Sequence, residues 1–450
     1  MGYAVEVECM QKKTRIKISP PGPKARKIIS EDKKFIATVT KTSPIAAKRA
    51  KGAIVEDVDG NIYLDFTSGV SVVNTGHCHP KIVEAVRRQA GELMHFAGTD
   101  FYYDVQNRLA ETLVKITPGK FDKKVFFTNS GTESNECAIK LAKWSTNNNR
   151  FIAFIGAFHG RTIGSLSLTA SKVVHRNKYF PMMAGVTHIP YAYCYRCAYK
   201  MEYPDCDVWC AKILDEVYLS NFVPPDEVAA LFIEPVQGEG GYIVPPKKFM
   251  QEIRRITKKH KIIMVDDEVQ AGFGRTGRMF AVEHYKIEPE ILCLAKGLGS
   301  GMPIGATVFD AKLDFGVPGA HSNTYGGNLV ACASAMATIG VIKSEKLLKR
   351  AEKLGKIVSH RLNEMMDKYP LIGDVRGIGL MQAVELVKNR KTKNPAEKET
   401  DKILKHCYKN GLILLPCGTS GIRFIPPLVI KEDELNEGLD ILNGAFRKIK

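Results

Sequence analysis

Short apolar segments alternate with segments of helical periodicity through the middle of the chain. The apolar segments are rich in Val, Ile and Phe and have the length of buried strands. They are KKVFFTN, RFIAFIG, VAALFIEP, KIIMVDDE and ILCLAK, and the helical segments between them include TESNECAIKLAKWS and PKKFMQEIRRITKKH. This alternation over roughly two hundred residues predicts an α/β fold with a mainly parallel sheet and helices on both faces.

The N-terminal part has a different pattern. The first forty residues are basic and punctuated by prolines, so we expect an arm. Residues 54–66 alternate apolar and polar side chains around Asp59-Gly60, which predicts a hairpin with a primed turn. Helical periodicity follows over 79–93 and 104–116.

The pattern changes again after about residue 345. A charged helix leads to a strand pair near 372–386, and another helix is followed by the strands LILLPCG and GIRFIPP. We therefore predict a large domain over 71–344 and a smaller α+β domain over 345–450. The arm and hairpin of residues 1–70 are expected to pack with the small domain.

Composition narrows the class of protein. Apolar residues make up 44% and charged residues 25%, which is typical of soluble globular proteins. No uncharged apolar run of about eighteen residues is present, and glutamates stand where a signal peptide needs an apolar core. We expect a cytoplasmic protein without a membrane segment. The net charge of +17 raises nucleic-acid binding as an alternative, but the sequence contains no such motif, and anionic small molecules are favoured as ligands.

Ligands of open α/β sheets bind at the carboxyl ends of the strands, so the residues after each strand are candidates. KKVFFTN is followed by Ser130-Gly131-Thr132 and then a helix. Hydroxyls and free N–H groups at a helix N-terminus favour a phosphate. An N-cap without a ligand is the alternative.

The next two strand ends carry aromatic and charged residues. Phe158 and Arg161 follow RFIAFIG, where they are suited to stack on a ring and to bind a carboxylate. Glu234 and Glu239 lie at the glycine-rich end of VAALFIEP. A core aromatic, a surface arginine and solvated acids are the alternatives.

Three acids, Asp266, Asp267 and Glu268, follow the buried strand KIIMV. Buried carboxylates are costly unless a cation or a proton answers them, so a metal ion or a protonated heterocyclic nitrogen is expected there. GFGRTG (272–277) matches the dinucleotide-binding pattern G-x-G-x-x-G. That alternative is disfavoured because the preceding acids would repel a pyrophosphate.

Lys296 is the one charged residue between Ile291 and Phe309. Apolar surroundings favour the neutral amine, which is a nucleophile able to form a Schiff base with a carbonyl. A reactive lysine, a phosphate site, a ring-stacking aromatic and a buried acid together suit one ligand, pyridoxal 5′-phosphate.

Seven segments in this order resemble the class III pyridoxal-phosphate aminotransferases of fold type I. They are NSGTESNECAIKLAK, AFHGRT, FIEPVQGEGG, VDDEVQAGFGRTG, LAKGLGSGMPIGA, HSNTYGGN and IRFIPPL. The family includes 4-aminobutyrate, ornithine and acetylornithine aminotransferases, and the resemblance covers residues 35–445. It implies a homodimer with the active site at the subunit interface.

The resemblance also implies a role for each matching residue. Lys296 would hold the cofactor and carry the proton between substrate and cofactor, and Asp267 would pair with the ring nitrogen. Arg161 would bind a substrate carboxylate. Glu239 and Arg423 resemble a gate pair, in which the glutamate masks the arginine for an amine substrate and releases it for the second carboxylate of 2-oxoglutarate. The other implied cofactor contacts are Ser130, Gly131 and Thr132 at the phosphate, Phe158 on the ring, Gln270 at the 3-hydroxyl, His159, Glu234 and Val269 around them, and Thr324 from the partner subunit.

The implied reaction is ping-pong transfer of an amino group from an amino acid to 2-oxoglutarate, with ω-amines such as 4-aminobutyrate, ornithine or lysine as preferred donors. Amino-acid racemases resembling this family are the main alternative, because they need the same lysine and aspartate. Residues 99–103 depart from typical 4-aminobutyrate enzymes and leave the donor open. A binding protein without catalysis is disfavoured by the presence of Lys296, Asp267 and Arg161.

One cysteine-rich segment has no place in this chemistry. Cys194, Cys197, Cys206 and Cys210 have the spacing C-x2-C, eight residues, C-x3-C. A structural zinc, two disulfides and four free thiols are all compatible with it. We expect an external loop that does not touch the active site.

Overall fold

The computed structural model describes residues 14–449. The strands that the apolar segments predict are all present, and further strands lie toward both ends of the chain. Their bounds are β1 Ala47–Lys51, β2 Ile54–Asp57, β3 Ile62–Asp65, β4 Lys123–Thr128, β5 Arg150–Phe154, β6 Val186–Ile189, β7 Val228–Ile233, β8 Ile263–Asp267, β9 Ile291–Leu294, β10 Gly305–Asp310, β11 Ile372–Ile378, β12 Met381–Leu386, β13 Leu412–Ile413, β14 Leu415–Cys417 and β15 Gly421–Phe424.

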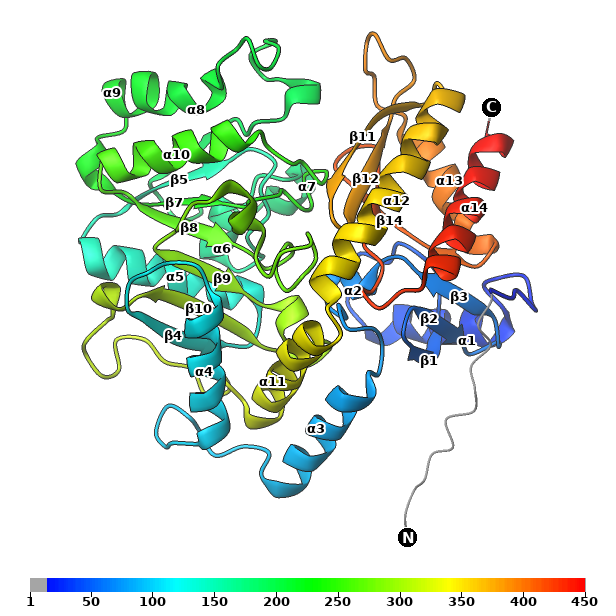
Figure 1. Cartoon of the computed structure of the whole chain (residues 1–450), viewed down its shortest axis with the longest axis horizontal. Helices are drawn as coiled ribbons and strands as arrows, with labels where there is room; N and C mark the ends of the chain where they lie inside the picture. Colours follow the sequence, from blue (N-terminus) through cyan, green and yellow to red (C-terminus); the bar gives the residue numbers. More distant parts are fainter. Residues whose placement is uncertain (1–13, 450) are drawn as a thin grey trace.

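The α-helices lie between and around these strands (Figure 1). Within the described residues, none is both long and apolar enough to span a lipid bilayer. Their bounds are α1 Pro23–Phe35, α2 Ser68–Ser71, α3 Pro80–Glu92, α4 Asp104–Ile116, α5 Gly131–Thr146, α6 Ile163–Leu168, α7 Val173–Arg176, α8 Trp209–Ile213, α9 Leu219–Asn221, α10 Lys247–Lys259, α11 Leu329–Ser344, α12 Leu347–Lys368, α13 Glu397–Lys409 and α14 Glu432–Lys448.

The largest sheet has seven strands in the order β4-β10-β9-β8-β7-β5-β6. Neighbours from β9 to β6 are parallel, whereas β10 runs antiparallel to both β4 and β9. The mainly parallel sheet that the sequence predicts is therefore confirmed. Because β5, β7, β8 and β9 run in the same direction, the loops that follow them meet at one edge of the sheet.

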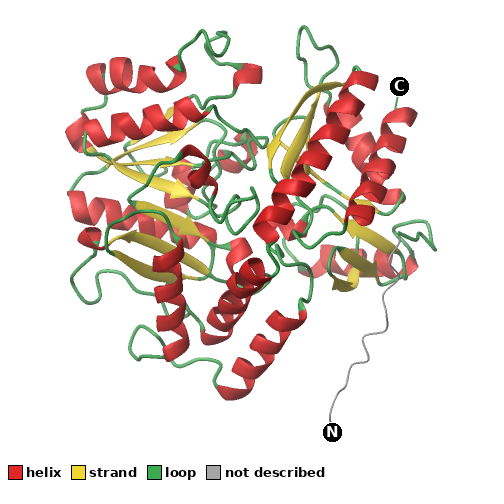
Figure 2. Ribbon diagram, in the orientation of Figure 1, coloured by secondary structure: helices red, strands yellow, loops and turns green. Residues whose placement is uncertain are grey.

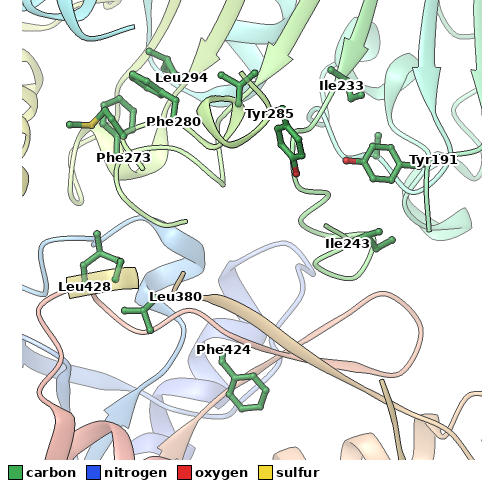
Figure 3. Close-up of a cluster of buried hydrophobic side chains, with 14 of the residues drawn as sticks. Tyr191, Ile233, Ile243, Phe273, Phe280, Tyr285, Leu294, Leu380, Phe424 and Leu428 are labelled. Atoms are coloured by element: carbon green, nitrogen blue, oxygen red, sulfur yellow. The ribbon is translucent and has the colours of Figure 1, made fainter. Parts of the chain in front are cut away.

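Helices cover both faces of this sheet because its central strands are apolar on both sides. Alternate residues of each strand point to opposite faces. Phe232 and Val265 pack in a cluster with α5, whereas Ile233 and Met264 pack in a cluster with α10. The second cluster continues into the C-terminal part of the chain: Figure 3 shows Phe280 and Leu294 above Leu380, Phe424 and Leu428. The core therefore joins the large sheet to the smaller sheets.

Two four-stranded sheets lie beside the large one (Figure 2). One has the order β11-β12-β15-β14 and belongs to the C-terminal part. The other has the order β1-β2-β3-β13, and β13 pairs in parallel with β3 through Leu412 and Leu64. The N-terminal hairpin and the C-terminal part thus share a sheet.

Two local predictions need correction, and a third gains detail. Residues 1–13 of the predicted arm lie outside the described residues, and its described part contains the helix α1, which begins at Pro23. The hairpin turn is not primed, because among its residues only Gly60 has a positive φ, 84°, and its N–H donates to the carbonyl of Asp57. The segment LILLPCG is two strands, β13 and β14, which belong to different sheets.

The cysteine-rich segment is fixed to the C-terminal sheet by polar contacts. The four thiols are free, and in residues 14–449 no group of three or more His, Cys, Asp or Glu side chains could hold a metal ion. Tyr193 and Arg196, on either side of Cys194, both hydrogen-bond to Glu385 of β12. The predicted external loop is therefore also a contact between two parts of the fold.

Candidate active site

Lys296 lies in the wall of a cavity of about 390 Å³ at the carboxyl edge of the large sheet. It follows β9 and begins a 3₁₀ turn with φ 44°, a strained value for a residue other than glycine. Burial lowers the pKa of its amine, and the positive charge of Arg423 acts in the same direction, although Asp267 opposes both. The structure therefore favours a reactive, neutral amine at this position.

The N-terminus of α5 forms one end of the cavity. Ser130 is the N-cap, and its hydroxyl accepts a hydrogen bond from the N–H of Glu133. A Cβ on Gly131 would come 2.6 Å from Cγ1 of Val269, so only glycine fits there. The hydroxyl of Thr132 lies 2.8 Å from that of Thr162. Free N–H groups and hydroxyls at the N-terminus of this sixteen-residue helix suit a phosphate.

Asp267 ends β8 and is held by three neighbours. Its Oδ2 lies 2.8 Å from Nδ1 of His159 and accepts a hydrogen bond of 2.9 Å from the amide of Asn135. Its Oδ1 accepts a hydrogen bond from the N–H of Val269. Burial alone would lower the pKa of His159, but the hydrogen bond and charge of Asp267 outweigh it and raise the pKa. The carboxylate is therefore fixed in orientation at the cavity wall.

Glu234 connects two loops beneath the cavity. Its carboxylate accepts hydrogen bonds from the N–H groups of Phe158 and Gly238, at 2.9 and 3.0 Å. Burial raises its pKa to about 7, and the charge of Asp267 contributes to that rise. Glu234 therefore lines the cavity and also fixes the backbone of the two loops beside it.

Two arginines approach the cavity from different parts of the fold. The guanidinium of Arg161 lies over the ring of Phe158, 5.6 Å from its centre. Arg423, on β15, is 6% exposed and lies 3.2 Å from a carboxylate oxygen of Glu239. The other oxygen of Glu239 accepts a hydrogen bond of 2.7 Å from Lys172.

The predicted residues gather as expected, with one exception. Arg161 and the predicted cofactor contacts other than Thr324 line the cavity, and Glu239 and Arg423 lie beside it as an ion pair. Thr324 is exposed and is not part of this chain's cavity wall. The resemblance places it in the partner subunit's site, so its position here does not contradict that expectation.

Three residues of the site were not singled out from the sequence. Asn135 lies one helical turn after Gly131 and faces Asp267, a spacing that the sequence does show. Tyr242 donates a hydrogen bond of 2.7 Å to the side-chain oxygen of Gln270. Lys172 reaches Glu239 from the start of α7, and no sequence pattern marks it.

The segment GFGRTG lies inside the molecule and does not open a helix. Arg275 is fully buried and donates hydrogen bonds to the carbonyl of Pro426 and to Asn74. Arg275 thereby joins the N-terminal, central and C-terminal parts of the chain. The dinucleotide alternative is wrong.

Comparisons with known proteins agree with this geometry. Residues 35–446 match the class III aminotransferase family. The chain is 38% identical to a probable 4-aminobutyrate aminotransferase of Bacillus subtilis, over 89% of this chain and 92% of that protein. It is also 38% identical to an alanine/serine racemase of Pyrococcus horikoshii, over 99% of this chain and 95% of that protein. A structure of ornithine aminotransferase from Toxoplasma gondii, with pyridoxal phosphate partially occupying its active site, is 31% identical with a TM-score of 0.83, over 94% of each chain.

Proposed function

This chain belongs to the class III family of pyridoxal-phosphate-dependent aminotransferases, and we propose that it transfers the amino group of an ω-amino acid to 2-oxoglutarate. The relatives named for 4-aminobutyrate and for 5-aminovalerate support donors of this class. Ornithine and lysine are further candidate donors with a terminal amine.

The cavity residues fit the cofactor. Ser130, Gly131 and Thr132 would hold the phosphate, because the missing Cβ of Gly131 leaves the helix N-terminus open. Phe158 would cover the ring, and Gln270, oriented by Tyr242, would bind its hydroxyl. When bound, pyridoxal phosphate takes up the amino group and the electron pair left by removal of a proton from carbon.

Lys296 would be the acid and base of the reaction. Its amine is in the cavity wall, and burial favours its neutral form, which can accept a proton from the substrate carbon that bears the amino group. The same amine would then deliver that proton to the cofactor and not back to the substrate carbon. Asp267, fixed by His159 and Asn135, would place its negative charge against the ring nitrogen.

The observation that carries the proposal is the pair of arginines. Arg161 is free to bind one carboxylate, whereas Arg423 is paired with Glu239. An ω-amino acid with one carboxylate needs only the first arginine. A dicarboxylate needs both, and 2-oxoglutarate would therefore have to displace Glu239 from Arg423.

A racemase is the second candidate function. The alanine/serine racemase relative aligns over 99% of this chain, and a leucine/methionine racemase of Thermococcus litoralis is 40% identical over 91% of it. In that reaction the proton would return to the same carbon from the opposite face. Lys296 and Asp267 would serve both reactions.

The active unit would be a homodimer. Thr324 is exposed, and so are the apolar side chains of Met94, Phe96 and Tyr102. Exposed apolar side chains of this kind favour an interface between subunits. The phosphate would then be bound by this chain's cradle together with Thr324 of the partner subunit.

The test is a single half-reaction. The holoenzyme is mixed with one amine at a time without any 2-oxo acid, and the visible spectrum and the chirality of the amino acid are followed. Stoichiometric conversion to the pyridoxamine form that then stops would support the aminotransferase and identify the donor. If the original spectrum persists while an L-amino acid loses its optical activity, the result would contradict the aminotransferase and support the racemase.

A further inference from the structure

Glu239 has two cationic partners, and the closer one is Lys172. The lysine donates a hydrogen bond of 2.7 Å to Oε1, whereas Arg423 lies 3.2 Å from Oε2. The contact with Arg423 lacks hydrogen-bond geometry, because both Nε and Nη1 of that arginine are buried without a hydrogen-bond partner. Burial alone would raise the pKa of Glu239, but the charges of both cations lower it, and only Lys172 adds a hydrogen bond to its charge.

The two partners also come from different parts of the fold. Glu239 lies in the loop after β7, and Lys172 stands at the start of α7, which follows β5 and α6; β5 and β7 are neighbours in the large sheet. The segment before Lys172 is pinned by hydrogen bonds of Ala170 with Gly156 and Ala157 at the end of β5. Arg423 stands on β15 of the C-terminal sheet. The backbone carbonyl of Glu239 also accepts a hydrogen bond from Gly418, between β14 and β15, so it is the Lys172 contact that ties the side chain of Glu239 to the large-sheet side of the site.

Release of Glu239 from Arg423 would be costly if the glutamate had no other partner. Its side chain is 19% exposed, and a buried charge that loses its counterion is strongly destabilised. Lys172 lowers this cost, because Glu239 keeps a hydrogen-bonded cation after another carboxylate has bound Arg423. Arg423, with two unpaired N–H groups, is already prepared for such a ligand.

We propose that Lys172 is a positioning residue that retains the Glu239 carboxylate while Arg423 binds the second carboxylate of a dicarboxylic substrate. It thereby sets the affinity of the site for dicarboxylates relative to monocarboxylates. This inference deepens the proposed function, since it concerns the acceptor that the aminotransferase would use. Lys172 itself would not touch the substrate.

The test measures binding without any reaction. Glutarate, which has two carboxylates, and pentanoate, which has one, are titrated into the holoenzyme by calorimetry. The proteins are the wild type, Lys172→Met, Glu239→Gln and the double variant. Lys172→Arg tests rescue, and Lys178→Met is the matched control, because Lys178 is an exposed lysine on the same segment without contact to Glu239.

Lys172→Met is expected to weaken glutarate binding about tenfold, the equivalent of one charged hydrogen bond, and to leave pentanoate binding unchanged. In the Glu239→Gln background the same substitution should change glutarate binding by less than about twofold, because no carboxylate remains to be retained. Lys172→Arg should restore most of the affinity, and Lys178→Met should have no effect.

Three results would overturn the inference. Equal losses of glutarate affinity in both backgrounds would mean that Lys172 binds the substrate directly. No loss in either would mean that the lysine is irrelevant, and equal losses for glutarate and pentanoate would indicate a structural defect. The titration involves no transfer of an amino group, so it tests Lys172 separately from the proposed function. A racemase result in the half-reaction would refute the proposed function and would leave the result of the titration open.

Discussion

Lys296, just after β9, combines a positive φ with a buried amine in the cavity wall. Replacement of this side chain removes both the attachment point of the cofactor and the proton carrier. Lys296→Ala should therefore lower kcat at least about a thousandfold, as expected when a general base and a covalent step are lost together. The measurement is amine consumption with the visible spectrum; exposed Lys120→Ala is the control. Appreciable turnover by the alanine variant would contradict the assignment.

Two buried acids beside Asp267 make a prediction about pH. Burial raises the pKa of Glu268 to about 8, and burial together with the charge of Glu268 raises the pKa of Asp266 well above its usual value. In the unfolded chain both carboxyls ionise at about pH 4. Between these values the unfolded state binds fewer protons than the folded state, so stability falls as pH rises from about 4.5 to 8.

Glu268→Gln should remove part of this fall, which amounts to about 1.4 kcal/mol per pH unit for each proton. Calorimetric unfolding of the holoenzyme from pH 5 to 9 measures it, and exposed Glu92→Gln should follow the wild type. A Glu268→Gln profile parallel to that of the wild type would show that the carboxyl is already ionised at pH 5.

Two helical glycines, Gly131 at the N-terminus of α5 and Gly340 in α11, have opposite surroundings. Gly131 packs against Val269 at the phosphate cradle, whereas a Cβ on Gly340 would meet nothing within 4 Å. Gly131→Ala should weaken cofactor binding about tenfold or more, because Val269 must move. Gly340→Ala should leave cofactor affinity unchanged and stabilise the fold by about 0.5–1 kcal/mol. Fluorescence titration of the apoenzyme with pyridoxal phosphate and thermal unfolding measure the two effects; unchanged affinity in Gly131→Ala would refute the cradle.

Elements with strong periodicity could be predicted from the sequence, and the exceptions have physical reasons. The bounds of α3 and α4 follow their apolar spacing, but α11 is apolar almost all round and has no polar face to mark it. LILLPCG looks like one strand because an apolar run does not show that β13 pairs with β3 while β14 pairs with β15. The cavity residues could be assigned because strand ends in a parallel sheet converge, whereas Lys172 meets Glu239 only through the folding of a loop.

At the scale of the whole molecule, the parts are joined by buried polar contacts as well as by the apolar core. The division at residues 70 and 344 stays a prediction. Arg275 ties the central segment to Pro426, and Glu385 of β12 binds Arg376 at 2.8 Å together with Arg196 and Tyr193 of the cysteine-rich segment. Arg376 in turn donates to the carbonyl of Gly241, close to Glu239. The cysteine-rich segment is thus connected to the loop that carries the gate pair.

Glu385→Gln tests how much this connection stabilises the molecule. Glu385 is 6% exposed, and its replacement leaves Arg196 without a carboxylate partner and Arg376 with only Asp374. Breaking a buried ion pair costs about 3 kcal/mol, so the unfolding midpoint should drop by several degrees. Glu364→Gln, which removes an exposed helix-surface pair, should cost less than about 0.5 kcal/mol. Equal midpoints for the two variants would mean that the apolar core alone holds the cysteine-rich segment in place. A drop confined to Glu385→Gln would show that the charged network fixes that segment to the C-terminal sheet.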